Sequence, residues 1–480
     1  LKCEDVIEAY IDRISVVEPY INATVERSID VALKEAREVD SLIASGKYTK
    51  EQLAAEKPLL GVPFSVKLFL NVKVVALKQV LCLIGYLNTA GCRCFENMRA
   101  TNDAECVRLF KEAGAIVIAT TNVPEFGMNT ETVNYLHGRT KNPYDTNRGC
   151  GGSSGGESSL IGAGGSVIGL GNDILGSVRI PTHFCGIYGH KSTHDLVPNK
   201  GTCPPDRFEK MQGAYNILEA GPMCRYAEDL ITTMRVLAVG DEEIRRKIGQ
   251  PVDFKKLKVL YLTEIGMYLM CPIRKDLTEA MKNVGSYFST RYGVEYKEIK
   301  LPFLRKVTKC FISELQQLIP NASSGFLDGI GRPLNKKWDL IKSVFGKSVL
   351  SFNINMIMNF ADFPLVYRKS ENSYYNKMWQ EVVQCFDDLL DENTVLLLPS
   401  FPTTALYHHE MIFYCLPCCP YAGLFNLLGL PATQCQIGYD SEGLPYGVQI
   451  IGRKNNDNLT ISCAVELEKA FGGWRSPGKV

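Results

Sequence analysis

The chain has 480 residues, of which 45% are hydrophobic, 22% charged and 10% aromatic. These proportions are typical of a soluble globular protein and exclude a disordered, collagen-like or coiled-coil chain. Lys and Arg number 53 against 52 Asp and Glu, a net charge of +1, so we expect no nucleic acid partner.

Two amphipathic helices are predicted at the start of the chain, over residues 4–17 and 29–43. In both segments apolar residues recur at three- and four-residue steps between charged ones. A short strand bounded by turns is then predicted within 58–67, and it ends on Lys67.

A helix is predicted over 102–113, followed by a buried strand over 115–119. Asn102 and Glu105 have the spacing of a capping box, and Gly114 supplies a left-handed C-terminal cap. The strand is a short, uninterrupted apolar run.

Strands and helices alternate in the second half of the chain, which indicates an α/β fold. Strands are predicted at 257–262, 294–301, 394–398 and 446–451, and helices at 276–289 and 459–471. No internal repeat, Ser/Pro-rich linker or long block of charge divides the chain. We therefore expect a single large domain.

The stretch from 149 to 177 is unusual, because it holds eleven glycines in 29 residues together with several serines. A flexible linker is the simplest interpretation of a Gly/Ser run. Here apolar residues such as Leu160, Ile161 and Val167 interrupt the run, so tightly wound buried loops and a helix are predicted instead.

Two common motifs can be matched inside this stretch, and the surrounding residues argue against both. The segment 151–155 fits the GxSxG nucleophile elbow, but the polar segment 142–148 stands where the elbow needs a hydrophobic strand. Gly169 and Gly171 begin a dinucleotide-binding fingerprint, but the third glycine, Gly176, falls two positions late.

A larger set of motifs resembles the amidase signature family, in that family's order and spacing and along the whole chain. The matching segments are 61–67, 121–125, 138–144, 151–157 and 171–181. The resemblance implies a central twisted mixed β-sheet covered by helices on both faces, in one domain spanning 1–480. Its expected parts are N-terminal helices at 1–50, a Gly/Ser-rich catalytic core at about 58–235, a variable substrate-channel region at about 300–370, and the C-terminal part of the core at 390–480.

The resemblance also implies a Ser-Ser-Lys triad. Ser177 would be the nucleophile, Ser153 the bridging serine on a cis peptide, and Lys67 the base. The backbone N–H groups of Ile174, Leu175, Gly176 and Ser177 would form the oxyanion hole, while Ser154, Asp173 and Arg179 would support the loop.

These residue types suffice for acyl transfer. A serine hydroxyl becomes a good nucleophile when a neighbour takes its proton, and a lysine can do so only when it is neutral. Burial disfavours the ammonium form, and Lys67 is followed by the apolar Leu68, Phe69 and Leu70. Backbone donors that stabilise the oxyanion are each worth roughly 3 kcal/mol in comparable sites.

Three alternatives remain open. The first is a Ser-His-Asp triad drawn from the six histidines, which are His137, His183, His190, His194, His408 and His409. The second is an amidase-fold protein that binds lipid amides without hydrolysing them. The third is a glutaminase-type subunit of a transamidation complex, which shares the triad and needs partner subunits.

Two features depart from the family's pattern. Leu175 stands where the family usually has a second glycine, so its side chain is expected to crowd the oxyanion loop or to forbid a positive φ. Residues 68–87 form a largely apolar run where the family has an acidic residue and a polar, glycine-containing loop.

Fatty acid amides are the substrates that the resemblance implies, namely long-chain primary amides and N-acylethanolamines. The segment 311–367 is apolar and contains methionine, which suits an acyl channel or a membrane-facing cap as well as a core helix. We expect an intracellular protein, a peripheral membrane contact and a homodimer. The chain starts at Leu1, so we also expect an N-terminal targeting segment to be missing from this sequence.

Cysteine usage favours a reducing compartment, because the 17 cysteines are scattered without the spacing of a disulfide scaffold. The one CxxC, Cys415 to Cys418, has only His408 and His409 nearby as a second ligand pair. We expect neither a metal nor another cofactor. No uncharged apolar run reaches the roughly 18 residues that would cross a bilayer.

Overall fold

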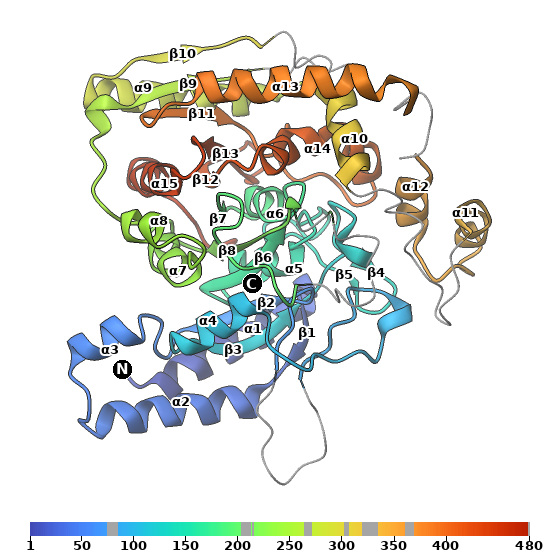
Figure 1. Ribbon diagram of the computed structural model, residues 1–480. Helices are drawn as coiled ribbons and strands as arrows, with labels where there is room; N and C mark the ends of the chain where they lie inside the picture. The colour runs from blue at the N-terminus through green and yellow to red at the C-terminus, as the bar shows by residue number, and fades with distance from the viewer. Residues whose placement is uncertain are drawn as a thin grey trace.

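The computed structural model describes residues 1–73, 85–202, 213, 216–263, 271–301, 307–318, 335–360 and 369–478. Its centre is an 11-stranded sheet in the order β1-β3-β2-β6-β8-β7-β12-β13-β11-β9-β10, accompanied by a small hairpin, β4-β5 (Figure 1). The strands are β1 Thr24–Arg27, β2 Pro63–Lys67, β3 Ile116–Thr121, β4 Val133–Asn134, β5 Gly138–Arg139, β6 Ile168–Asp173, β7 Tyr188–Lys191, β8 Glu219–Cys224, β9 Lys258–Tyr261, β10 Tyr296–Glu298, β11 Thr394–Leu398, β12 Ala432–Tyr439 and β13 Pro445–Ile451.

The large sheet is mixed, as the resemblance implies. β2 runs parallel to both β3 and β6, and β9 runs parallel to both β10 and β11. The strands between these two groups pair antiparallel. Strands from the start and from the end of the chain therefore share one sheet.

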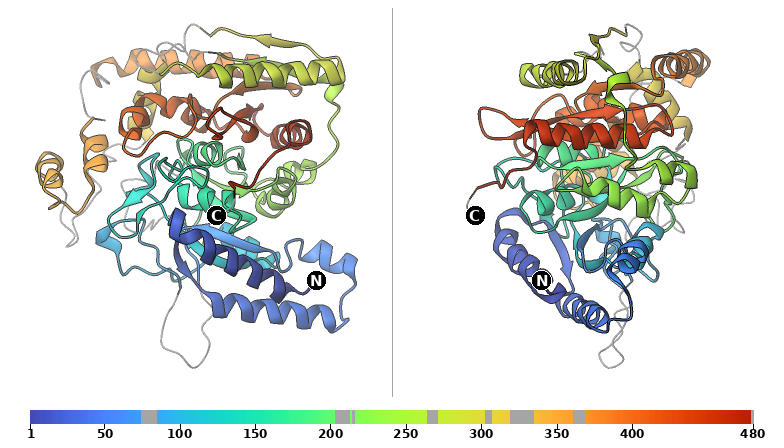
Figure 2. Two further views of the ribbon diagram at one scale, coloured as in Figure 1. Left: turned by 180° about the vertical axis from the view of Figure 1, so that it is seen from behind. Right: turned by 90° about the vertical axis from the view of Figure 1, so that its left-hand side faces the viewer.

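Helices lie on both faces of the sheet, and α9 and α13 flank its β9 to β11 end on opposite sides (Figure 2). None of the helices in the described ranges is both long enough and apolar enough to span a membrane. The α-helices are α1 Cys3–Ile21, α2 Ile29–Ala44, α3 Lys50–Glu56, α4 Glu105–Glu112, α5 Gly155–Gly162, α6 Arg179–Phe184, α7 Asp229–Leu237, α8 Glu242–Lys247, α9 Lys275–Tyr292, α10 Val307–Leu318, α11 Lys336–Val344, α12 Phe352–Phe360, α13 Asn372–Leu389, α14 Met411–Leu427 and α15 Asp457–Phe471.

The elements predicted from periodicity are present, and one predicted cap is wrong. Helix α4 begins at Glu105 with Ala104 at its N-cap and no side-chain cap, so Asn102 and Glu105 do not form a capping box. The Glu105 side chain instead pairs with Arg108, three residues on. Gly114 does adopt the expected left-handed conformation, with a φ of +93°.

Strand β6 was not predicted, because it lies inside the glycine-rich stretch that we expected to form loops and a helix. Its residues Gly169 and Gly171 interrupt the apolar alternation that usually reveals a strand. Tertiary packing explains Gly169: a β-carbon there would lie 1.8 Å from Oε1 of Glu157 in α5. Helix α5 therefore packs directly on the strand.

The main core packs β2 against α4 and so fixes the strand that ends on Lys67. Phe64 of β2 and Phe110 of α4 are fully buried, with ring centroids 5.3 Å apart in an edge-to-face arrangement. Pairs of this geometry add stability beyond the area that they bury.

Replacing Phe110 with alanine should lower the free energy of unfolding by about 3 to 5 kcal/mol, because it leaves a cavity beside β2. Chemical denaturation followed by circular dichroism measures the change. Phe413, which is 76% exposed, supplies the matched control, and Phe413→Ala should change stability by no more than about 0.5 kcal/mol. Equal losses in both variants would contradict this account of the core.

Candidate active site

The predicted base lies at the carboxyl end of β2, where the neighbouring parallel strand β6 also ends. Ligands of open α/β sheets commonly bind beyond the carboxyl ends of the strands. Lys67 is the last residue of β2, and Asn172 is the last but one of β6. The Lys67 side chain is completely buried.

The Lys67 amine contacts the predicted bridging serine. Its Nζ lies 2.8 Å from Ser153 Oγ. It also lies 2.5 Å from Oδ1 and 3.2 Å from the main-chain O of Asn172. The Phe69 ring, whose centroid is 5.7 Å from Nζ, provides an apolar wall. Two of the predicted catalytic side chains, 86 residues apart in sequence, are thus in direct contact.

Ser153 is held on an unusual backbone, because the peptide bond between Gly152 and Ser153 is cis. Packing on this turn is close: a β-carbon at Gly151 would lie 2.6 Å from Pro181 Cα, and one at Gly152 would lie 2.6 Å from Asn129 O. Only glycine fits at these two positions. Helix α5 begins at once, at Gly155.

Ser177 lies next to this turn and is half-buried. The Ser154 N–H donates to the main-chain O of Ser177 at 3.1 Å, which joins the two serine-bearing loops. Within the described part of the chain no hydrogen bond connects Ser177 Oγ to Ser153 Oγ. The structure therefore brings Lys67 and Ser153 into contact and places the Ser177 segment beside them.

A buried ion pair between Asp173 and Arg179 closes the loop that carries Ser177. Both side chains are fully buried, and Nη2 of Arg179 lies 3.0 Å from Oδ1 of Asp173. Burial alone would raise the pKa of Asp173, but the Arg179 charge and the donated N–H bonds hold it well below its usual range. Arg179 also donates to the main-chain O of Ala422 and to Oε1 of Gln449, so the loop is tied to α14 and β13.

The four predicted oxyanion donors are not equivalent. The Gly176 N–H donates to Oδ1 of Asp173 at 2.7 Å and is therefore already occupied. The N–H groups of Ile174, Leu175 and Ser177 have no hydrogen-bond acceptor within the described ranges of the chain.

The backbone conformation of this loop requires glycine at 176. Gly176 has a φ of +105°, and a β-carbon there would lie 2.5 Å from Ala422 Cβ. Leu175 does not have a positive φ, so the expected backbone conflict does not arise at this position.

An apolar group of side chains, which we call the site-side cluster, adjoins these loops. Phe69 and Phe126 bring it close to Lys67 and Ser153, since a β-carbon at Gly127 would lie 3.3 Å from Ser153 Oγ. The half-buried Leu175 packs at its edge. Its buried members are Leu68, Phe69, Ala90, Cys92, Val123, Phe126, Phe311, Leu350, Ile354, Ile357, Met358, Cys415 and Cys419.

The two apolar segments noted in the sequence contribute to this cluster. Residues 68 and 69 begin the run 68–87, of which 74–84 lie outside the described residues. Helices α10 and α12 supply members from the segment 311–367, of which 319–334 and 361–367 lie outside the described residues.

The histidines form hydrogen bonds with residues outside the candidate active site. His190 lies 3.0 Å from Oδ1 of Asp457, and His183 lies 3.0 Å from the main-chain O of Thr403. His194 is next to Glu219. Across the described ranges, none of the six histidines hydrogen-bonds to Ser153 or Ser177. This arrangement gives no support to a Ser-His-Asp triad.

The predicted CxxC is helical, because Cys415 and Cys418 both lie inside α14. In the described portion of the chain, no group of three or more His, Cys, Asp and Glu side chains could hold a metal ion.

Sequence reasoning did not single out two buried polar residues near the site, Asn172 and Glu125. Both lie inside segments that match the amidase signature family, and this position is the sequence feature that could have identified them. Oε2 of Glu125 accepts the Ser351 N–H at 2.7 Å, just before α12. Burial raises the pKa of Glu125 to about 7.

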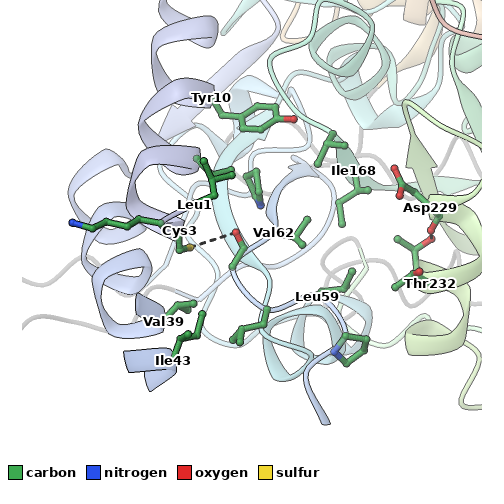
Figure 3. A pocket seen from close by; sticks show the side chains of 18 residues that line it. Leu1, Cys3, Tyr10, Val39, Ile43, Leu59, Val62, Ile168, Asp229 and Thr232 are labelled. Carbon is green, nitrogen blue, oxygen red and sulfur yellow. Dashed lines mark hydrogen bonds between the residues drawn. The ribbon is translucent and has the colours of Figure 1, made fainter. Parts of the chain in front are cut away.

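A separate cavity of about 530 Å³ lies at the opposite ends of the same strands (Figure 3). Pro63 and Ile168, which begin β2 and β6, line it together with Cys3 and Tyr10 of α1. It contains none of the predicted catalytic residues.

Comparison with known proteins identifies the family of the chain. A family model described as Amidase matches residues 5–461. Fatty-acid amide hydrolase 2-A of Danio rerio is 38% identical over 481 residues, covering 99% of this chain and 87% of that protein. Fatty-acid amide hydrolase 2 of Homo sapiens is 36% identical over 487 residues, covering 100% and 88%.

Among solved structures, 6-aminohexanoate cyclic dimer hydrolase complexed with substrate aligns with a TM-score of 0.75 and 21% identity, over 99% of this chain and 95% of that one. At this identity the likeness concerns the fold. The predicted membership is confirmed by the family model and by the two relatives: the chain belongs to the amidase family and is an amide hydrolase.

Proposed function

We propose that this amide hydrolase cleaves fatty acid amides to a fatty acid and an amine or ammonia through an acyl-enzyme on Ser177. The observation that carries the proposal is the 2.8 Å contact between the buried Lys67 Nζ and Ser153 Oγ. Support for the substrate class comes from the two relatives named fatty-acid amide hydrolase 2.

In the proposed reaction, Oγ of Ser177 attacks the amide carbonyl while its proton passes through Ser153 to the neutral Lys67 amine. Ser153 then returns a proton to the leaving nitrogen, and the C–N bond breaks. The N–H groups of Ile174, Leu175 and Ser177 are the proposed donors to the oxyanion. Water, deprotonated along the same route, attacks the acyl ester and releases the acid.

The site-side cluster is the proposed contact surface for the acyl chain. It adjoins both the lysine and the oxyanion loop, and Phe311 and Leu175 both lie close to Gly423 of α14. Binding a long alkyl chain is favoured by apolar area, so the cluster would select long acyl groups over short ones.

We also infer a peripheral contact with an anionic lipid bilayer, made by α11 and the turn after it. Trp338, Ile341, Val344 and Phe345 are 55%, 50%, 63% and 72% exposed. Lys337 and Lys347 are exposed next to them. An exposed apolar face with a tryptophan and adjacent lysines is typical of helices that lie in a membrane interface. Helix α11 lies at the side of the molecule, beside α12 (Figure 1).

Ser177→Ala should abolish labelling by a fluorophosphonate probe and lower hydrolysis of oleamide by at least about a thousandfold, because the nucleophile is removed. Ser158→Ala is the matched control, since Ser158 is a buried serine of α5 whose hydroxyl has no hydrogen-bond partner among the described residues. It should label fully. Labelling of the Ser177 variant at the parental level would refute the nucleophile. Turnover of glutamine instead of oleamide would favour the glutaminase alternative.

Phe311→Ala should lower kcat/KM for oleamide roughly tenfold and leave that for butyramide nearly unchanged, because the short chain does not reach the lost contact. Phe352→Ala, which changes an exposed phenylalanine at the start of α12, is the control. A similar fall for both amides would show that the cluster is structural only.

Substituting Trp338 and Phe345 with serine should reduce co-sedimentation with phosphatidylserine-containing vesicles several-fold, and salt should weaken binding of the parent. Tyr20→Ser with Val16→Ser removes two exposed apolar side chains of α1 as a control. The membrane contact is disproved if the α11 variant sediments like the parent protein.

A further inference from the structure

We propose that Asn172 is a positioning residue that orients the Lys67 amine toward Ser153. The inference rests on the proposed function, because it concerns the base of that reaction. It assigns a role to a side chain that makes no contact with the reacting amide in the proposed scheme and acts only through the lysine.

Asn172 offers Lys67 two oxygen atoms at once. Its Oδ1 lies 2.5 Å from Nζ and its main-chain O lies 3.2 Å from Nζ, while Ser153 Oγ lies 2.8 Å away. All three residues are buried. The amine is therefore surrounded by oxygen atoms with defined positions.

The sheet fixes Asn172 in this position. Strand β6 pairs in parallel with β2 on one side, and Asn172 is opposite Ala220 of β8 on the other. The next residue, Asp173, is held by Arg179. The main-chain oxygen of Asn172 therefore has little freedom to move away from Nζ.

The number of N–H groups on the Lys67 amine determines which neighbour its lone pair faces. A neutral lysine amine carries two N–H groups and one lone pair. If it donates both N–H groups to Oδ1 and O of Asn172, the lone pair faces the Ser153 hydroxyl and can take its proton. An asparagine supplies these acceptors without a charge, whereas a carboxylate in its place would stabilise the ammonium form.

Three charged side chains of the described residues, those of Glu157, Asp173 and Arg179, lie close to this region. Glu157 of α5 accepts hydrogen bonds from Ser65 and Thr121, and burial raises its pKa to about 7. The Asp173–Arg179 ion pair follows β6. The parent and an Asn172 variant have these three groups in common, so a difference between their pH profiles is attributable to position 172.

The decisive experiment compares Asn172→Asp with the parent in the pH dependence of kcat/KM for oleamide. The added carboxylate should favour the charged lysine and move the acidic limb of the profile to higher pH by about one unit or more. Asn393→Asp adds the same charge at an exposed position and should leave the limb unchanged. An Asn172→Asp profile that coincides with the parent overturns the inference.

A second variant covers the case in which the Asp variant does not fold. Asn172→Leu removes only the side-chain acceptor and should lower kcat at least about tenfold with KM within about twofold of the parent, since substrate binding is not involved. A parental kcat would overturn the inference. Fluorophosphonate labelling of the parent protein distinguishes a failure of this inference from a failure of the proposed function. If the parent is labelled at Ser177 and the Asn172 variants keep parental kinetics, only the role of Asn172 is refuted. If the parent is not labelled, the proposed function and this inference are both refuted.

Discussion

The fully buried ion pair between Asp173 and Arg179 is the constraint on which the rest of the site depends. An isolated charge is costly to bury, so each partner must be matched and its remaining hydrogen bonds satisfied. Asp173 accepts N–H groups of its own loop, and Arg179 reaches Ala422, Asn426 and Gln449. One interaction thus shapes the loop and also fastens it to the C-terminal part of the sheet.

This anchoring defines what the loop can offer to a substrate. The Gly176 N–H is used internally, while those of Ile174, Leu175 and Ser177 are left without a recorded partner in the described residues. Such groups are favourable where negative charge develops, because they are oriented before the reaction begins. The leucine at 175, a departure from the family's pattern, packs against the site-side cluster and so joins the proposed oxyanion loop to the proposed acyl surface.

The proposed base, Lys67, must be uncharged to accept a proton, whereas Asp173 and Arg179 must both be charged. The loop needs a stable charge pair, whereas the proposed reaction needs Lys67 in its neutral form. Neither Ser153 nor Asn172, whose oxygen atoms contact the Lys67 amine, carries a charge. The two conditions are met a few ångströms apart because β6 carries Asn172 and Asp173 in succession. An uncharged acceptor serves the lysine, and the next residue serves the arginine.

The sequence by itself determined the family and some of the regular elements. Apolar patterns predicted α1, α2, β3, β11 and α15, and the resemblance to the amidase signature family implied that Lys67 and Ser153 belong to one site. Strand β6 escaped prediction because Gly169 and Gly171 interrupt the alternation of side chains. A β-carbon at Gly169 would collide with Glu157 of α5, and one at Gly171 would collide with Met223 of β8. Tertiary structure likewise decided the contacts of Asn172 with Lys67, the occupied N–H of Gly176 and the exposed apolar face of α11. Local patterns record the solvent exposure of a segment, but contacts between residues far apart in sequence arise only when the sheet brings the ends of its strands together.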